Sequence, residues 1–136
     1  MAVFVHRGEQ LLVLHRAEDN YWHVVAGALD EGETYAEAAR RELREETGLD
    51  VQPNDLDLEQ TYAITERERP LYPDGTAAVV IRSFEVEAPA GWEPRLNHEH
   101  DRHQWATPAV AREIMFWVET QEAIDLLAPR LVSPPR

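Results

Sequence analysis

The sequence predicts an α/β domain in which helices cover a mixed β-sheet. The chain has 136 residues, which is enough for one hydrophobic core and too few for two. Short β-branched and aromatic runs alternate loosely with helical segments, and two longer runs in the middle flank a polar loop, as an antiparallel pair does. This order is typical of a mixed sheet covered by helices. We expect one domain over residues 1–128, followed by a tail over residues 129–136.

Five segments have the composition of strands. The first two flank a turn at residues 7–9, and a short aromatic and β-branched run at residues 21–26 follows them. The loop at residues 65–76 contains Arg, Pro, Asp and Gly, as the tip of a hairpin does. The expected strands cover residues 2–5, 11–15, 57–64, 77–86 and 103–106.

The clearest helix is expected from Tyr35 to Thr47. Thr34 is a favourable N-cap, and Glu37, three residues later, completes a capping box. Gly48 lies where a left-handed C-terminal cap is needed. Both ends of this helix are therefore marked in the sequence.

Two more helices are expected towards the end of the chain. Thr107 is a cap and Pro108 follows it at the first helical position, so a short helix should run through about Ile114. A last helix is expected over residues 120–127. Pro129 should end it, because proline lacks the N–H that continues a helix. We expect residues 133–135 to be disordered.

Three acidic side chains share one face of the helix at residues 35–47. Glu42, Glu45 and Glu46 stand at i, i+3 and i+4, so their carboxylates project within an arc of about 100°. The neighbouring arc carries an apolar stripe of Ala36, Ala39 and Leu43. Three like charges on one face destabilise a helix. A hard cation such as Mg²⁺ would offset that repulsion, because it prefers oxygen ligands.

The charge of the chain restricts its partners. A formal net charge of −13 argues against nucleic acid, because binding there depends on cationic contacts to phosphate. The same charge repels an anionic substrate, and divalent cations would offset that repulsion. The chain has no cysteine, no apolar run of about 18 residues and no signal-peptide pattern. We therefore expect a cytoplasmic protein that binds neither nucleic acid nor a membrane.

The segment from Gly27 to Leu49 contains this acidic helix and the turn before it. It fits the pattern Gly-x5-Glu-x7-Arg-Glu-aliphatic-x-Glu-Glu-x-Gly-aliphatic at every position. In this it resembles the box of the Nudix (MutT-like) hydrolases. The resemblance implies an α/β/α sandwich with a mixed sheet. It also implies hydrolysis of a nucleoside diphosphate linked to another moiety, with Mg²⁺ or Mn²⁺ as the cofactor.

The same resemblance implies roles for individual residues. Arg41 would orient the glutamates during catalysis, and Glu33 would support the loop. The carbonyl of Gly27 would be one metal ligand. The side chains that would ligate the metal, and from which a general base would come, are Glu42, Glu45 and Glu46.

Other positions resemble the branch of dihydroneopterin triphosphate pyrophosphohydrolases, which also act on dNTPs. Residues 25–27 read Val-Ala-Gly where many Nudix hydrolases have Pro-Gly-Gly, and Glu99 precedes Trp105 with five residues between them. By this resemblance Glu99 is a further metal ligand or the general base. The substrate is then a small nucleotide or pterin triphosphate, cut to the monophosphate and pyrophosphate. Its expected contacts are His15, Arg16, Trp22 and Ala26.

Several alternatives stay open. A Nudix enzyme could instead act on 8-oxo-dGTP, a dinucleoside polyphosphate or ADP-ribose, and a non-catalytic nucleotide-binding domain is the alternative outside enzymes. Trp22 is equally compatible with a core wall and with a stacking platform. His98, His100 and His103 suggest zinc, but a carboxylate-rich site without cysteine argues against it. His23 is interpreted as a structural residue. The oligomeric state is not predicted.

Overall fold

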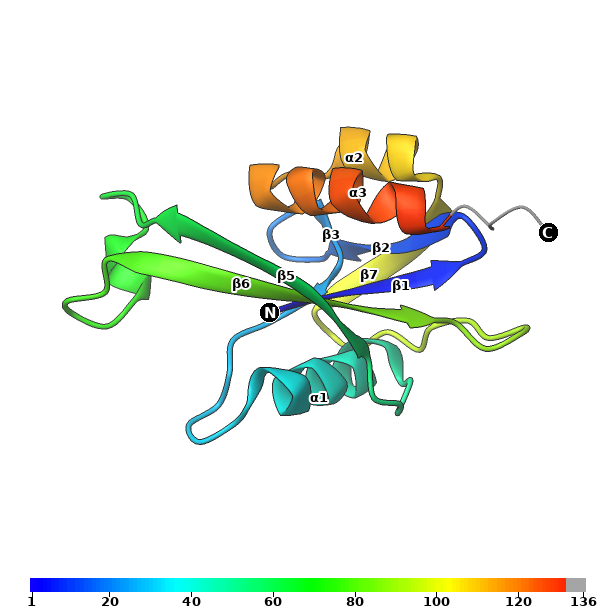
Figure 1. Ribbon diagram of the computed structural model, residues 1–136, viewed down its shortest axis with the longest axis horizontal. Coiled ribbons are helices and arrows are strands. Elements are labelled where there is room, and N and C mark those ends of the chain that lie inside the picture. The colour runs from blue at the N-terminus through cyan, green and yellow to red at the C-terminus, as the bar shows by residue number, and fades with distance from the viewer. Residues whose placement is uncertain (132–136) are drawn as a thin grey trace.

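Helices lie on both faces of a mixed β-sheet (Figure 1). Helix α1 (Tyr35–Thr47) covers one face, and α2 (Pro108–Ile114) and α3 (Val118–Leu131) lie side by side on the other. The structure is a computed structural model that describes residues 1–131. It confirms the α/β/α sandwich that the sequence predicts. Within these residues, no helix combines the length and the apolar character of a membrane span.

Seven strands pair in one sheet. They are β1 (Ala2–Arg7), β2 (Gln10–Arg16), β3 (Trp22–His23), β4 (Val25–Ala26), β5 (Asn54–Ala63), β6 (Ala78–Glu87) and β7 (His100–Ala106). Strand β1 is central: it runs parallel to β6, with Val3 opposite Phe84, and antiparallel to both β2 and β4. Strands β5 and β6 form the expected antiparallel pair, which extends away from the rest of the molecule (Figure 1).

The sheet separates two hydrophobic cores, and β1 contributes to both. Because successive side chains of a strand point to opposite faces, Val3 and Val5 pack in the core beneath α1, and Phe4 packs in the core beneath α2 and α3. Leu43 of α1 and Ile124 of α3 are fully buried on their respective sides. Burial on both faces explains why β1 and β2 are apolar runs rather than alternating ones.

Helix α1 has both of the predicted caps. The Glu37 backbone N–H donates to the Thr34 hydroxyl at 3.1 Å, and the Thr34 N–H donates to the Glu37 carboxylate at 3.0 Å. Gly48 ends the helix with a φ of 82°. The predicted apolar stripe is partly wrong, because Ala36 is exposed. It lies two residues before Ala38, the first buried residue of the helix. The buried residues of α1 are Ala38, Ala39, Leu43, Glu46 and Thr47.

The last helix is longer than expected, and Pro129 does not end it. Helix α3 starts at Val118 and runs through Pro129 to Leu131. A proline this close to the end of a helix removes one hydrogen bond of the final turn. Leu127 and Leu131, four residues apart, are both buried against the sheet and offset that loss. Strand β7 is also longer than expected, because it pairs with β2 along its length. The tail predicted to be disordered, residues 133–135, lies outside the described residues.

Candidate metal and phosphate site

Arg41 of α1 connects the acidic side chains on the helix to the loop before it. Its Nε and Nη2 donate to the two oxygens of Glu33 at 2.8 and 2.9 Å, a bidentate pair. Its Nη1 donates to Glu42 at 2.9 Å and to Glu45 at 3.3 Å, and its Nη2 reaches the carbonyl of Ala28 at 3.1 Å. The guanidinium lowers the pKa of Glu33 to about 2. Arg41 therefore fixes the loop and two glutamates in one arrangement.

Gly27 lies against the carboxylate of Glu42. A Cβ at this position would lie 2.5 Å from both Cδ and Oε1 of Glu42. Any larger residue would therefore displace that carboxylate or the strand. The Gly27 carbonyl, a predicted metal ligand, accepts a hydrogen bond of 2.8 Å from the backbone nitrogen of Met1. A carbonyl oxygen has two lone pairs, so one remains for a cation.

Glu46 is the buried member of the acidic face. Its exposed fraction is 2%, and its Oε2 has no hydrogen-bond partner among the described residues. The pKa of Glu46 is raised to about 10. Burial is the largest cause, and the nearby Glu42 and Glu99 add to it. A buried carboxylate without partners is unfavourable. A divalent cation would supply what it lacks, so these residues fit the metal that the acidic helix predicts.

His100, the first residue of β7, and Glu99, the residue before it, approach Glu46. One ligand atom from each of these three side chains lies within 4.8 Å of the others. His100 is 4% exposed, and its Nε2 lies 3.8 Å from Oε1 of Glu46. Burial lowers the pKa of His100. The three histidines considered for zinc do not gather: His103 contacts Glu93 at 3.3 Å instead.

Side chains of both charges line a cleft of about 430 Å³ beside this group. Arg16, expected to contact substrate, lies at the cleft with its Nη1 4.0 Å from Glu99. Glu45 does not line it: its side chain is 48% exposed and held by Arg41. An anionic group in the cleft would meet Arg16 and any cation held by the carboxylates. The lining is Arg16, Ala17, Glu18, Ala26, Gly27, Glu42, His98 and Glu99.

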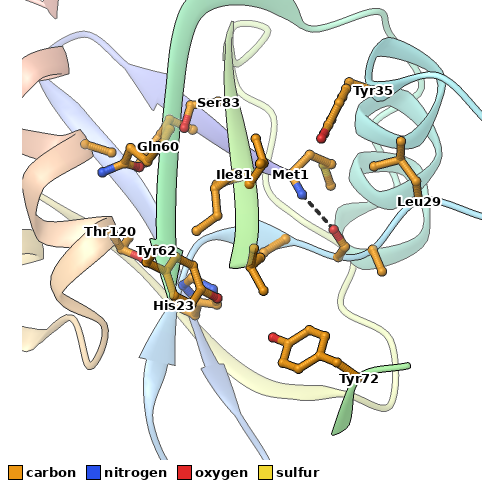
Figure 2. Close-up of a pocket in the computed structure, with 18 residues that line it drawn as sticks. Met1, His23, Leu29, Tyr35, Gln60, Tyr62, Tyr72, Ile81, Ser83 and Thr120 are labelled. Carbon is orange, nitrogen blue, oxygen red and sulfur yellow. Dashed lines mark hydrogen bonds between the residues drawn. The ribbon is translucent and has the colours of Figure 1, made fainter. Parts of the chain in front are cut away.

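A second cavity, of about 410 Å³, adjoins the cleft and shares Ala26 and Gly27 with it. Figure 2 shows Tyr62 of β5 and Tyr72 of the loop between β5 and β6, with Tyr35 of α1 across the cavity. The other labelled residues are Met1, His23, Leu29, Gln60, Ile81, Ser83 and Thr120. The lining of this cavity contains aromatic side chains, whereas the lining of the cleft contains charged ones.

Two buried polar atoms of this cavity have no hydrogen-bond partner in the described residues: Nδ1 of His23 and Oγ of Ser83. Burial lowers the pKa of His23 to about 4, so its imidazole is neutral near pH 7. The sequence predicts a structural role for His23 and contains no signal for Ser83. No local pattern marks either residue, because strands distant in sequence bring them together.

Two predicted substrate contacts, His15 and Trp22, lie outside the cleft and the aromatic cavity. His15 is 5% exposed, and its ring nitrogens contact Asp101 at 2.7 Å and Asn20 at 2.9 Å. Trp22 packs edge-on against the His15 ring, with centroids 5.1 Å apart. Neither residue belongs to the lining of the two cavities. Their roles as substrate contacts stay predictions, as do those of Arg16 and Ala26, which do line the cleft.

Known proteins resemble this chain in sequence and in fold. A Myxococcus xanthus protein named octanoyltransferase is 38% identical over 117 residues, which is 83% of this chain and 31% of that protein. The dihydroneopterin triphosphate diphosphatase of Escherichia coli K12 is 36% identical over 59 residues, 43% of this chain and 39% of that one. The chain thus spans about a third of the length of these two relatives.

A solved structure agrees with the fold over almost the whole chain. The E. coli dihydroneopterin triphosphate pyrophosphohydrolase superimposes with a TM-score of 0.83 at 24% identity, covering 95% of this chain and 93% of that one. The family model of the NUDIX domain matches residues 1–127, which include the acidic helix, the cleft and Glu99. The chain belongs to the Nudix family.

Proposed function

We propose that the chain is a divalent-cation-dependent pyrophosphohydrolase that cuts a nucleoside or pterin triphosphate to the monophosphate and pyrophosphate. Membership of the Nudix family supports hydrolysis of a phosphoanhydride bond. One observation carries the proposal: Glu46, buried with an unpaired oxygen, lies beside Glu42 and Glu99, and these two line a cleft that also contains Arg16. The proposed cofactor is Mg²⁺, for which Mn²⁺ would substitute.

The side chains that would hold the cation are Glu42, Glu46 and Glu99. The Gly27 carbonyl and Glu45 are further candidate ligands. A bound divalent cation would neutralise phosphate charge and polarise the bond that is cut. These ligands also account for how a chain with a net charge of −13 binds an anion.

Arg16, Glu99 and Arg41 have distinct proposed tasks. Arg16 would contact a phosphate, because it is the cation in the lining. Glu99, whose side chain is 43% exposed, is better situated than the buried Glu46 to take a proton from an attacking water. Arg41 would act as a positioning residue, since it holds Glu42 and Glu45.

The aromatic cavity supports a substrate with a flat heterocyclic ring. Its volume of about 410 Å³ is in the range of small-molecule sites, roughly 300–1,000 Å³. A ligand with its phosphates in the cleft would pass Ala26 and Gly27 and reach Tyr62 with its ring. The name of the E. coli relative, a dihydroneopterin triphosphate diphosphatase, is consistent with such a ring. Dihydroneopterin triphosphate and dNTPs are therefore the substrates we propose.

The central test is the Glu46→Gln variant, which keeps the side-chain size and removes the charge. We expect Mg²⁺-dependent pyrophosphate release to fall by at least about 100-fold. Thermal stability of the metal-free protein should be nearly unchanged, because the pKa of Glu46 is raised to about 10 by burial and the side chain is already uncharged near pH 7. Glu113→Gln, a substitution of an exposed glutamate on α2, is the matched control. Near-full activity of the Glu46 variant would refute the assignment.

A substrate panel separates this proposal from its alternatives. Dihydroneopterin triphosphate, dATP, 8-oxo-dGTP, a dinucleoside polyphosphate and ADP-ribose would be compared under one set of conditions. Release of inorganic pyrophosphate identifies a simple triphosphate as the substrate. Tight binding of a nucleotide without turnover of any compound would instead indicate a non-catalytic domain.

A further inference from the structure

We propose that His15 is a positioning residue that holds Arg16 in place at the cleft. It does so by bridging Asn20, in the loop between β2 and β3 (residues 17–21), and Asp101 in β7. The inference deepens the proposed function and rests on it in one respect, the contact between Arg16 and a phosphate. It gives His15 a role different from the substrate contact that the sequence predicts.

The first observation is that both ring nitrogens of His15 are hydrogen-bonded, each to a different segment of the chain. Nδ1 donates to Oδ1 of Asp101 at 2.7 Å, and Nε2 is hydrogen-bonded to the side-chain amide of Asn20 at 2.9 Å. His15 is 5% exposed and packs edge-on against Trp22, with ring centroids 5.1 Å apart. Buried polar networks whose members are all bonded make a structure rigid. The ring therefore fixes the loop relative to β7.

The second observation is a β-bulge beside His15. His15 pairs with Arg102 of β7. Arg16, the next residue, pairs with His100, so the register shifts between the two pairs. Asp101 lies between the two β7 partners and is the extra residue of the bulge. Bulges change the direction of nearby side chains and are frequent beside active sites. The hydrogen bond from His15 to Asp101 thus holds the sheet at the position where the strand direction changes, one residue before Arg16.

The third observation is that the 17–21 loop is held next to Arg16 and Glu99. The backbone N–H of Asn20 donates to the carbonyl of Arg16 at 3.1 Å, and the N–H of Ala17 donates to the carbonyl of Glu99 at 3.0 Å. Asn20 has a φ of 55°, a left-handed conformation that asparagine adopts more readily than most residues. Its side chain, bonded to His15, links this turn of the backbone to the buried ring.

Arg16 depends on this bridge because its own contacts lie within the same loop. Its Nε donates to Asp19 at 2.9 Å, and its Nη1 lies 4.0 Å from Glu99. A shift of the loop would therefore move Arg16 and Asp19 together, away from the cleft. A displacement of about 1 Å in a group that holds substrate can cost about 100-fold in rate. A lost binding contact that is equal in the ground state and the transition state raises KM and leaves kcat unchanged.

The first experiment separates the side chain of Asn20 from the backbone turn. Asn20→Gly removes the hydrogen bond to His15 and keeps a left-handed backbone, which glycine adopts without strain. Asn20 is exposed, so the two hydrophobic cores stay intact. We expect KM for dATP with Mg²⁺ to rise by about tenfold, and kcat to change by less than about threefold.

The matched control is Asp57→Gly in β5. Asp57 also has a φ of 55°, and its side chain is 94% exposed. This variant loses a polar side chain from the same backbone conformation, away from the cleft, and should keep the wild-type KM. A wild-type KM in Asn20→Gly would overturn the proposal, because the turn alone would then be sufficient.

A double-variant cycle tests whether the bridge acts through Arg16. In an Arg16→Ala background, the addition of Asn20→Gly should change KM by less than about twofold, because the group that it positions is gone. Asp101→Asn keeps an oxygen that accepts from Nδ1 of His15 and should retain most of the wild-type affinity, whereas Asp101→Ala should resemble Asn20→Gly. Additive effects of Arg16→Ala and Asn20→Gly would contradict the proposal.

Amide hydrogen exchange in the metal-free protein supplies a readout that needs no turnover. The Ala17 N–H should exchange at least about tenfold faster in Asn20→Gly than in the wild type, while the amides of α1 keep their wild-type rates. Unchanged exchange at Ala17 would also overturn the proposal. The proposed function fails separately: if the wild type releases no pyrophosphate from any triphosphate but Ala17 protection depends on Asn20, the bridge stands and only the phosphate contact of Arg16 is lost.

Discussion

The charged cleft and the aromatic cavity are neighbours that are built in different ways. The cleft takes most of its side chains from residues 16–42, and Arg41 holds one of its carboxylates, Glu42. The cavity takes its lining from β1, β3, β4, β5, β6, α1, α3 and the loops before α1 and between β5 and β6. The two meet only at Ala26 and Gly27.

The difference indicates how cation binding and ring recognition are divided between the two regions. Cation binding needs a few carboxylates at close and fixed distances, and one helical turn with a glycine before it provides them. Recognition of a heterocyclic ring needs a surface that is complementary to that ring. Elements that are distant in sequence form this surface. Substitutions in the cleft should therefore affect catalysis on every substrate, and substitutions in the cavity should affect only the choice of substrate.

After Glu46→Gln, the largest effect is expected from Gly27→Ala, at the junction of the two regions. The added Cβ would lie 2.5 Å from the carboxylate of Glu42 and displace it. A displacement on this scale costs catalysis about 100-fold, so kcat/KM for pyrophosphate release should fall by that factor on all substrates. Gly8→Ala is the control for a loss of stability away from the site: its φ of 59° strains a side chain, but the added Cβ meets nothing within 4 Å. A drop confined to one substrate would show that Gly27 belongs to ring selection.

A smaller and more selective effect is expected from Tyr62→Ala in the aromatic cavity. Contact between a base and an aromatic side chain is worth about 1–3 kcal/mol. KM for the preferred triphosphate should therefore rise by about tenfold, while kcat changes by less than about threefold. Steady-state kinetics on two substrates with different rings would measure this. An equal loss of kcat on both would contradict the division between the two regions.

The pH dependence of stability tests the burial of His23. Its folded pKa of about 4 lies below the unfolded value of 6.5, so below pH 6.5 the unfolded chain binds more protons. This contribution to stability is complete above pH 6.5. It declines as the pH falls towards 4, by at most about 1.4 kcal/mol per pH unit. Urea unfolding of His23→Gln and of the wild type across this range should show a flatter profile for the variant. Parallel profiles would mean that His23 titrates normally.

The smallest effect is expected from Ser83→Ala. Its hydroxyl is buried without a partner in the described residues, so its removal should leave the free energy of unfolding unchanged or raise it by up to about 1 kcal/mol. If a substrate ring uses this hydroxyl, KM rises while stability does not fall. A clear loss of stability in denaturant unfolding would instead reveal a hydrogen bond to the Ser83 hydroxyl.

Local signals in the sequence were sufficient for several elements of the fold. The capping box at Thr34 and Glu37, and the cap and proline at Thr107 and Pro108, mark helix ends that the structure confirms. Hydrogen bonds within four residues determine these features, and such bonds can be inferred from spacing alone. Pro129 shows the limit of that inference, because packing of Leu131 extends α3 past it.

By itself, the sequence determined the acidic helix, its caps and the glycine before it, because each depends on neighbours within a few residues. Only the tertiary structure decided which carboxylate is buried, that His100 lies next to Glu46, and that His23 and Ser83 line one cavity. Those contacts depend on the pairing of β2 with β7 and of β1 with β6, across more than 70 residues of chain. Strand pairing over such separations follows from the packing of the whole sheet, which no local pattern encodes.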